Sequence, residues 1–90
     1  MKIIDVLKDV LAEYKHSIEK HGDYHSLHEG FSVLLEEVDE LWDEVRKKSS
    51  TNDQLRVRYT EARKEAIQVA SSALKVITFI DGRLENDETK

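Results

Sequence analysis

The chain of 90 residues is 39% hydrophobic and 37% charged, and it carries a formal net charge of −5 at pH 7. This acidic balance argues against a nucleic-acid backbone or an anionic membrane as the main partner, and the lack of cysteine excludes a disulfide framework and a thiol nucleophile. No stretch approaches the ~18 apolar residues that a membrane span needs, and the N-terminus lacks the apolar run of a signal peptide. We therefore expect a single cytoplasmic domain.

The first predicted helix covers about residues 2–20. Its apolar residues recur at intervals of three and four, so they share one face of the helix: Ile3, Leu7, Val10, Leu11, Tyr14 and Ile18. Gly22 is the first residue that interrupts the pattern, and glycine commonly caps a helix C-terminus because it adopts a left-handed conformation without strain. The segment from His21 to His25 is therefore predicted to be a short loop.

The second predicted helix begins with a capping box, Ser26 followed three residues later by Glu29, and runs to about Lys48. Its apolar positions again define one face: Leu27, Phe31, Leu34, Leu35, Val38, Leu41, Trp42 and Val45. Trp42 lies on this stripe, so we expect it in the core rather than stacked on a ligand. The three cations of residues 46–48 are predicted to form the last turn, where they interact favourably with the helix dipole.

The third predicted helix follows a second capping box at residues 51–54 and covers about residues 52–80. Its core face consists of Leu55, Tyr59, Ala62, Ala66, Val69, Ala73, Leu74, Ile77 and Ile80. Gly82 suits a C-terminal cap, and the residues after it are charged without a periodic apolar stripe. We therefore expect one helical domain over residues 1–82 and a flexible charged tail over residues 83–90.

These three amphipathic segments predict an all-α fold, a helical bundle of three main helices. A chain of 90 residues buries only about 60–65% of the surface that its unfolded form exposes, so it is marginally stable alone. The alanines at positions 62, 66 and 70 recur at intervals of four and would let another helix approach closely. We therefore expect a homo-oligomer, a dimer or a tetramer, in which further helices complete a four-helix-type core.

Carboxylates fill the positions between the apolar residues of the second helix. Six of the nine residues from 36 to 44 are acidic: Glu36, Glu37, Asp39, Glu40, Asp43 and Glu44. Like charges four residues apart, such as Glu36 and Glu40, destabilise an isolated helix by ~0.2–0.5 kcal/mol per pair. Two explanations are open at this point: a solvated acidic face on a core helix, and a site where a divalent cation offsets the repulsion.

Two strips of oxygen-bearing side chains lie beside the core faces of the second and third helices. On the second helix the strip consists of Glu37, Glu40 and Glu44. On the third helix it consists of Glu61, Glu65, Gln68 and Ser72. If the two helices pack antiparallel, the strips face each other and present hard oxygen ligands of the kind that Mg²⁺ or Mn²⁺ prefers.

The pattern E-E-x-x-E at residues 36–40, followed by E-x-x-Q at residues 65–68, resembles the signature of the MazG-like all-α nucleoside triphosphate pyrophosphohydrolases, E-E-x-x-E and then E-x-x-D. The resemblance covers roughly residues 26–80. It implies cleavage of nucleoside or deoxynucleoside triphosphates between the α- and β-phosphates, which yields a nucleoside monophosphate and pyrophosphate. It also implies Mg²⁺ as the cofactor, with Mn²⁺ as an alternative, and a role in cleaning the nucleotide pool.

The resemblance further assigns roles by position. The catalytic glutamates would be Glu36, Glu37 and Glu40. The metal ligands would be Glu37, Glu40, Glu65 and Gln68. Gln68 stands where the family has an aspartate, and its amide oxygen can coordinate Mg²⁺ but brings no charge and cannot act as a base. This departure leaves an alternative function open, a catalytically impaired MazG-like binding or interaction module; a third alternative is a helical oligomerisation protein with solvated acids.

A triphosphate carries about four negative charges, so carboxylates bind it only through a bridging cation, and basic side chains should complete its binding site. Lys64 and Lys75 on the third helix are candidates for that role. Glu61 lies one turn before Glu65 and is a candidate to compensate for the missing aspartate. Tyr24, in the loop before the second helix, is a candidate for contact with the base. An ordinary structural or surface role is the alternative for each of these residues.

Overall fold

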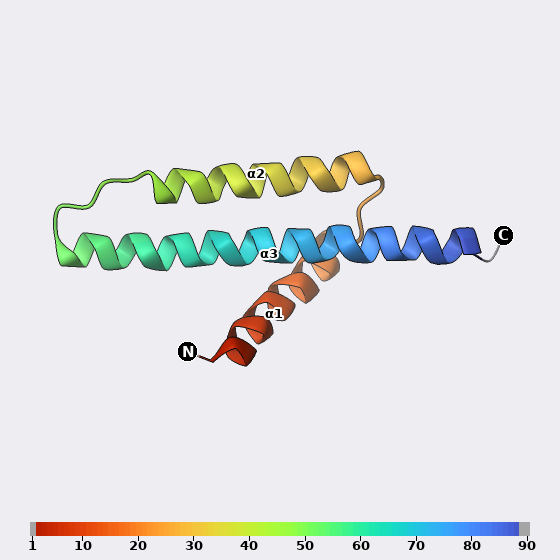
Figure 1. Cartoon of the computed structure of the whole chain (residues 1–90), viewed down its shortest axis with the longest axis horizontal. Helices are drawn as coiled ribbons and strands as arrows, with labels where there is room; N and C mark the ends of the chain where they lie inside the picture. The colour runs from red at the N-terminus through yellow and green to blue at the C-terminus, as the bar shows by residue number, and fades with distance from the viewer. Residues whose placement is uncertain (1, 89–90) are drawn as a thin grey trace.

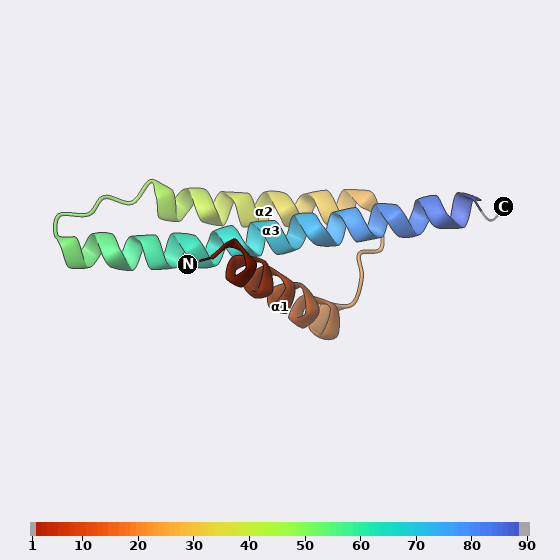
Figure 2. The same cartoon turned by 60° about the horizontal axis from the view of Figure 1, so that its bottom comes forward.

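The computed structural model describes residues 2–88 of the chain. Over that range it contains three helices and no strand: α1 (Ile3–His21), α2 (Leu27–Val45) and α3 (Asn52–Glu88). α2 lies antiparallel to α3, and α1 crosses α3 obliquely without contacting α2 (Figure 1; Figure 2). The predicted all-α bundle of three main helices is confirmed. No helix in the described range has the length and apolar character needed to cross a bilayer.

The N-cap bond of each predicted capping box forms. Ser26 Oγ accepts a hydrogen bond from the backbone N–H of Glu29 at 3.1 Å, and Thr51 Oγ1 accepts one from that of Gln54, also at 3.1 Å. The Gln54 side chain reaches one residue before the N-cap, where its Oε1 accepts a hydrogen bond from the backbone N–H of Ser50 at 2.8 Å. These bonds satisfy N–H groups that lack an acceptor within the helix, so they define where α2 and α3 begin.

The predicted C-terminal cap of α1 is also confirmed. Gly22 follows the helix with a φ of 72°, in the left-handed region that glycine adopts without strain. Its backbone N–H donates a hydrogen bond to the carbonyl of Ile18 at 2.8 Å. The bond satisfies a carbonyl of the last turn, and the chain turns here into the loop that leads to α2.

α2 ends earlier than its sequence predicts. Its last residue is Val45 and Arg46 is its C-cap, so the predicted end at Lys48 is wrong. The reason is a contact with α3, because the backbone carbonyl of Lys47 accepts a hydrogen bond from the guanidinium group of Arg58. The chain thus leaves the helical path at this point to reach the start of α3, and the cations after Arg46 belong to the connection instead of the last turn.

α3 ends later than its sequence predicts. The helix continues through Gly82, so the predicted cap at this residue is wrong. A glycine inside a helix costs only ~1 kcal/mol relative to alanine, and the contacts of neighbouring residues can offset that cost. One such contact follows directly, since the Arg83 guanidinium lies 4.9 Å from the centroid of the Phe79 ring, one turn earlier. Residues 83–88 therefore extend the helix where the sequence predicts a flexible tail, and residues 89–90 lie outside the described part.

The apolar stripes of the helices are only partly covered within the chain. Tyr24 and Phe79 are the buried apolar side chains of the described residues. On α2, Phe31 is 61% exposed and Trp42 is 59% exposed, and Ile3 on α1 is 73% exposed. The prediction that Trp42 lies in the core is therefore wrong for the single chain. The reason is that α2 has one neighbour, α3, which covers only one flank of the stripe.

The loop before α2 is anchored by Tyr24, whose ring packs on Gly30. A Cβ atom at Gly30 would lie 2.9 Å from Tyr24 Cδ2 and 3.3 Å from Val76 Cγ2, so the close approach of the loop, α2 and α3 requires glycine here. The sequence predicts Tyr24 as a loop residue and a candidate for contact with a base, and this packing leaves it only 7% exposed. The contact joins the loop, α2 and α3 at one end of the bundle.

Candidate metal centre and the adjoining pocket

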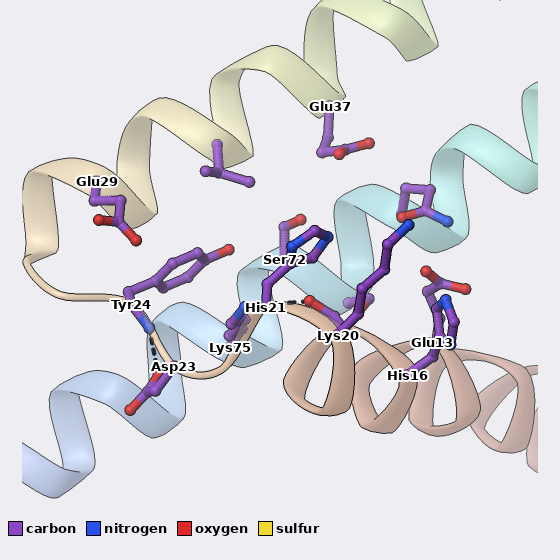
Figure 3. A pocket seen from close by; sticks show the side chains of 14 residues that line it. Glu13, His16, Lys20, His21, Asp23, Tyr24, Glu29, Glu37, Ser72 and Lys75 are labelled. Carbon is purple, nitrogen blue, oxygen red and sulfur yellow. Dashed lines mark hydrogen bonds between the residues drawn. The ribbon is translucent and has the colours of Figure 1, made fainter.

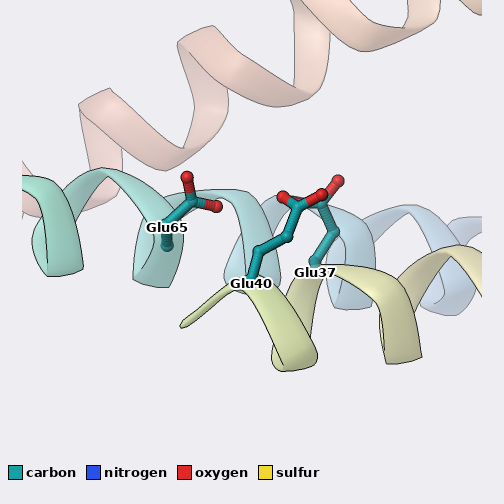
Figure 4. A group of neighbouring side chains, drawn as sticks. All are labelled: Glu37, Glu40 and Glu65. Atoms are coloured by element: carbon teal, nitrogen blue, oxygen red, sulfur yellow. The ribbon is translucent and has the colours of Figure 1, made fainter. Parts of the chain in front are cut away.

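Three carboxylates from two helices meet on the α2–α3 pair. Glu37 and Glu40 lie one turn apart on α2, and Glu65 faces them from α3 (Figure 4). One carboxylate oxygen from each residue lies within 4.8 Å of the others. The sequence analysis predicts a metal site only if α2 and α3 pack antiparallel. The structure has this packing, and it brings glutamates of the two acidic strips together. We call Glu37, Glu40 and Glu65 the carboxylate triad.

Burial and mutual repulsion disfavour the ionised forms of Glu37 and Glu65. Burial is the main cause that raises the pKa of Glu37 from its ordinary 4.5 to about 7, and the charges of Glu40 and Glu65 add to it. The pKa of Glu65 is also raised, again first by burial and then by the charge of Glu40. A proton or a cation between the carboxylates relieves the repulsion. The triad therefore favours a positively charged ligand.

An oxygen of Glu65 gives a second indication of a missing partner. Its Oε2 atom is buried and accepts no hydrogen bond, although buried polar atoms are ordinarily paired. The flanking acids differ, because Glu44 pairs with Lys47 at 2.7 Å and Glu61 pairs with Lys64 at 3.3 Å. No ion pair in the described part of the chain reaches the triad. Carboxylate oxygens are the type of donor that Mg²⁺ or Mn²⁺ prefers, and here they come from facing helices and one of them is buried and unpaired.

The other residues that the family pattern singles out lie beside the triad. Glu36 is exposed on α2, and its charge contributes to the raised pKa of Glu37. Gln68 lies one turn beyond Glu65 on α3 and lines the pocket next to the triad, together with Glu37. The predicted substrate residues Glu61 and Lys64 pair with each other, as described above, and line no part of that pocket.

The pocket next to the triad has a volume of about 500 Å³ (Figure 3). Its walls come from α1, the loop before α2, and the facing sides of α2 and α3. Two predicted substrate-binding residues, Tyr24 and Lys75, lie in these walls, and Lys75 is only 4% exposed. Glu37 lines the pocket as well, so the triad and the pocket share a residue. The triad and the pocket therefore adjoin at Glu37.

Lys75 has polar but uncharged contacts. Its Nζ atom donates a hydrogen bond to Ser17 Oγ at 3.2 Å and lies 4.5 Å from the centroid of the Tyr24 ring. Burial raises the pKa of Tyr24, and a hydrogen bond with Ser72 offsets part of this rise. The phenol is therefore neutral near pH 7 and keeps its capacity to donate a hydrogen bond.

The sequence does not reveal that α1 forms part of this pocket. Ser17 lies at the edge of the apolar face of the first helix, three residues after Tyr14 and seven after Val10. Periodicity does not say which part of the chain that edge meets. Lys75 is the residue that could have indicated the pocket, because it directly follows Leu74 of the predicted core face of the third helix. A cation at that place predicts either an aliphatic stem that packs or a buried charge with a function.

No family model matches this chain, and no curated protein or solved structure matches it significantly either. The resemblance to the MazG-like family therefore stays a prediction that rests on residues 36–40 and 65–68. The structure adds geometry to these motifs, since glutamates from both of them meet in the triad and a polar pocket lies beside them.

Proposed function

We propose that this chain is a metal-dependent pyrophosphohydrolase of nucleoside or deoxynucleoside triphosphates. The observation that carries the proposal is the carboxylate triad of Glu37, Glu40 and Glu65, whose ligand atoms lie within 4.8 Å of one another. An acidic site of this kind binds a triphosphate only through a cation, and the adjoining pocket has the size of a small-molecule site. Such an enzyme would clean the nucleotide pool of the cytoplasm.

The triad residues would hold the Mg²⁺ or Mn²⁺ ion, with the Gln68 amide as a further oxygen donor on the next turn of α3. When bound, the ion neutralises phosphate charge and lowers the pKa of a water molecule. In the reaction, water adds to one phosphorus of the α–β anhydride, and the bond from that phosphorus to the bridging oxygen breaks. The other phosphoryl fragment leaves with this oxygen, so the products are the nucleoside monophosphate and pyrophosphate. Glu36, exposed beside Glu37, would be a further ligand or orient the attacking water.

Product analysis tests the proposal. The purified chain is incubated with each common NTP and dNTP, first with Mg²⁺ and then with Mn²⁺. We expect a nucleoside monophosphate and pyrophosphate in equal amounts, and loss of both products in Glu40→Ala. Asp39→Asn is the matched control, because it removes an exposed carboxylate next to Glu40 that lies outside the triad. A chain that binds metal but turns over none of these substrates would refute the enzyme.

A binding or interaction module without catalysis is the second candidate. The observation that favours it is Gln68, a neutral side chain at the position where the family pattern has an acid. An amide cannot take up a proton from water, and it attracts a cation less strongly than a carboxylate does. Gln68→Asp separates the candidates: a gain of hydrolysis in an otherwise inactive chain supports an impaired relative, whereas full activity of the native chain excludes this candidate.

We further propose that the chain works as a homodimer, with a tetramer as the larger alternative. Support comes from the exposed apolar stripe, in which Phe31 is 61% and Trp42 is 59% exposed. In a two-fold symmetric dimer, the apolar stripe of one copy packs against the same stripe of the other copy, so each covers the other. Sedimentation velocity should show at least twice the mass of one chain, with a shift toward the monomer in Trp42→Lys. A monomer at all concentrations would contradict the proposal.

A further inference from the structure

The pocket beside the carboxylate triad contains a buried cation that has no acidic partner. Lys75 is 4% exposed, and none of the ion pairs of the described residues includes it. A buried ammonium group is unfavourable unless an anion or strong acceptors compensate for its lost hydration. Its contacts are the Ser17 hydroxyl at 3.2 Å and the Tyr24 ring at 4.5 Å. Because an ammonium group has three donors, its capacity is not exhausted.

Further hydrogen-bond donors surround this ammonium group. Ser71 and Ser72 on α3 line the pocket and are 3% and 8% exposed. The hydroxyl of Tyr24 points into the pocket from the loop before α2, on the side of Ser72 (Figure 3). With Ser17 from α1, the wall thus presents four hydroxyl groups from three segments of the chain beside Lys75, and Lys20 of α1 is a second cation in the lining. Hydroxyl groups rotate to donate when an acceptor arrives, and this combination suits the oxygens of an anion.

None of the four acids that line the same pocket forms an ion pair with Lys75. Asp23 accepts a hydrogen bond from the next backbone N–H at 2.8 Å, and Glu29 pairs with His25 at 3.1 Å. Glu37 belongs to the triad. Glu13 projects from α1 on the opposite side of the pocket (Figure 3). Lys75 therefore keeps donors for a ligand, because no described acid forms an ion pair with it.

We propose that this pocket is an oxyanion subsite, in which Lys75 and the hydroxyl groups of Ser17 and Ser72 bind a phosphoryl group of the nucleotide. The inference deepens the proposed function and rests on it, since a nucleotide with its cation at the triad extends past Glu37 into the pocket. The triad supplies negative charge for the cation, and Lys75 supplies positive charge for a phosphoryl group that the cation does not neutralise. A volume of about 500 Å³ leaves room for part of the nucleoside as well.

Isothermal titration calorimetry with inorganic pyrophosphate in EDTA tests the subsite, because chelation removes the route through the triad. Uridine serves as a neutral comparison. Lys75→Met removes the charge but keeps an unbranched side chain, and Lys15→Met is the matched control, an exposed lysine of α1 outside the pocket. We expect the native chain and Lys15→Met to bind pyrophosphate alike, and Lys75→Met to bind it roughly tenfold or more weakly, as loss of a charged hydrogen bond predicts.

Three results would overturn the subsite: no binding of pyrophosphate in EDTA, equal binding by the native chain and Lys75→Met, or tighter binding of uridine than of pyrophosphate. The last result would make the pocket a base site. If circular dichroism shows that Lys75→Met does not fold, the same titration is made with Ser17→Ala. Weaker pyrophosphate binding by this variant supports the subsite, and unchanged binding overturns it. If the chain binds pyrophosphate through Lys75 but hydrolyses no triphosphate, the proposed pyrophosphohydrolase activity is refuted and the proposed oxyanion subsite is still supported.

Discussion

The carboxylate triad makes a prediction about stability that requires no substrate. The variant Glu37→Gln keeps the shape of the side chain and removes a charge that burial, Glu40 and Glu65 disfavour. In the absence of metal and above pH 7, this variant should therefore be more stable than the native chain. Groups that repel one another at a site are ordinarily kept for function at the expense of stability.

The expected size of the effect follows from the pKa. A rise from 4.5 to about 7 means that ionised Glu37 costs the folded state about 3 kcal/mol before screening, at about 1.36 kcal/mol per pKa unit. Glu37 is partly exposed, and screening by water reduces this cost to about 1–2 kcal/mol. Because one kcal/mol moves the Tm of a domain this small by about 4–8 °C, we expect Glu37→Gln to raise Tm by roughly 5–10 °C at pH 8.

The effect should depend on pH in a defined direction. The folded-state pKa of Glu37 lies above its unfolded value, so protonated Glu37 contributes stability that is fully present below pH 4.5 and lost as the pH rises through about 7. Glutamine does not titrate. The Tm difference between Glu37→Gln and the native chain should therefore be largest at pH 8 and disappear near pH 4.5.

Thermal melting by circular dichroism in EDTA, from pH 4.5 to pH 8, checks this prediction. Asp39→Asn is the control for removal of an exposed negative charge from the same helix. Mg²⁺ added at pH 8 should raise the Tm of the native chain more than that of Glu37→Gln, because the cation binds the folded state. A lower or unchanged Tm for Glu37→Gln at pH 8, or a gain no larger than that of Asp39→Asn, would refute the reasoning.

Three further predictions concern the triad and the glycines. The affinity for Mg²⁺, measured by calorimetry, should rise up to about tenfold per pH unit below pH 7 and level off above it. The reason is that the cation must displace the proton of Glu37, whose pKa is about 7. An affinity independent of pH would contradict this. Gly82→Ala should stabilise the chain by about 0.5–1 kcal/mol in urea unfolding, since α3 is continuous there and nothing lies within 4 Å of the added Cβ atom; a loss would indicate a left-handed cap. Gly30→Ala should destabilise it by about 1–2 kcal/mol in the same assay, because its Cβ atom would lie 2.9 Å from Tyr24 Cδ2, and a gain like that of Gly82→Ala would show that the Tyr24 ring yields.

Features that depend on a few neighbouring residues were predictable from the sequence. The caps at Ser26, Thr51 and Gly22 form because each contact spans three or four residues and needs no other helix. The triad needed one further assumption, the antiparallel packing of two helices joined by a short connection. Given that packing, the spacing of Glu37 and Glu40 places both on the side that faces Glu65.

Features that depend on a neighbouring helix were not predictable. Periodicity identifies the residues that share a face, but not whether the face has a partner, so Trp42 was expected in the core although it is 59% exposed in the single chain. The continuation of α3 depends on a small balance between the cost of Gly82 and contacts such as that of Arg83 with Phe79. The side chains that α1 adds to the Lys75 pocket depend on the crossing of α1 over α3, which no local pattern encodes.

That crossing has a consequence for local unfolding. α1 touches α3 and not α2, and polar contacts contribute to its attachment: the Tyr14 hydroxyl donates to Thr78 Oγ1 at 3.3 Å, and Arg63 pairs with Asp9 at 2.7 Å. Exposed contacts of this kind add little free energy, so α1 can detach at Gly22 while the α2–α3 hairpin stays paired. Hydrogen exchange should then report two cooperative units, a labile first helix and a slower hairpin. The hairpin would keep its three glutamates together while one wall of the neighbouring pocket opens and closes.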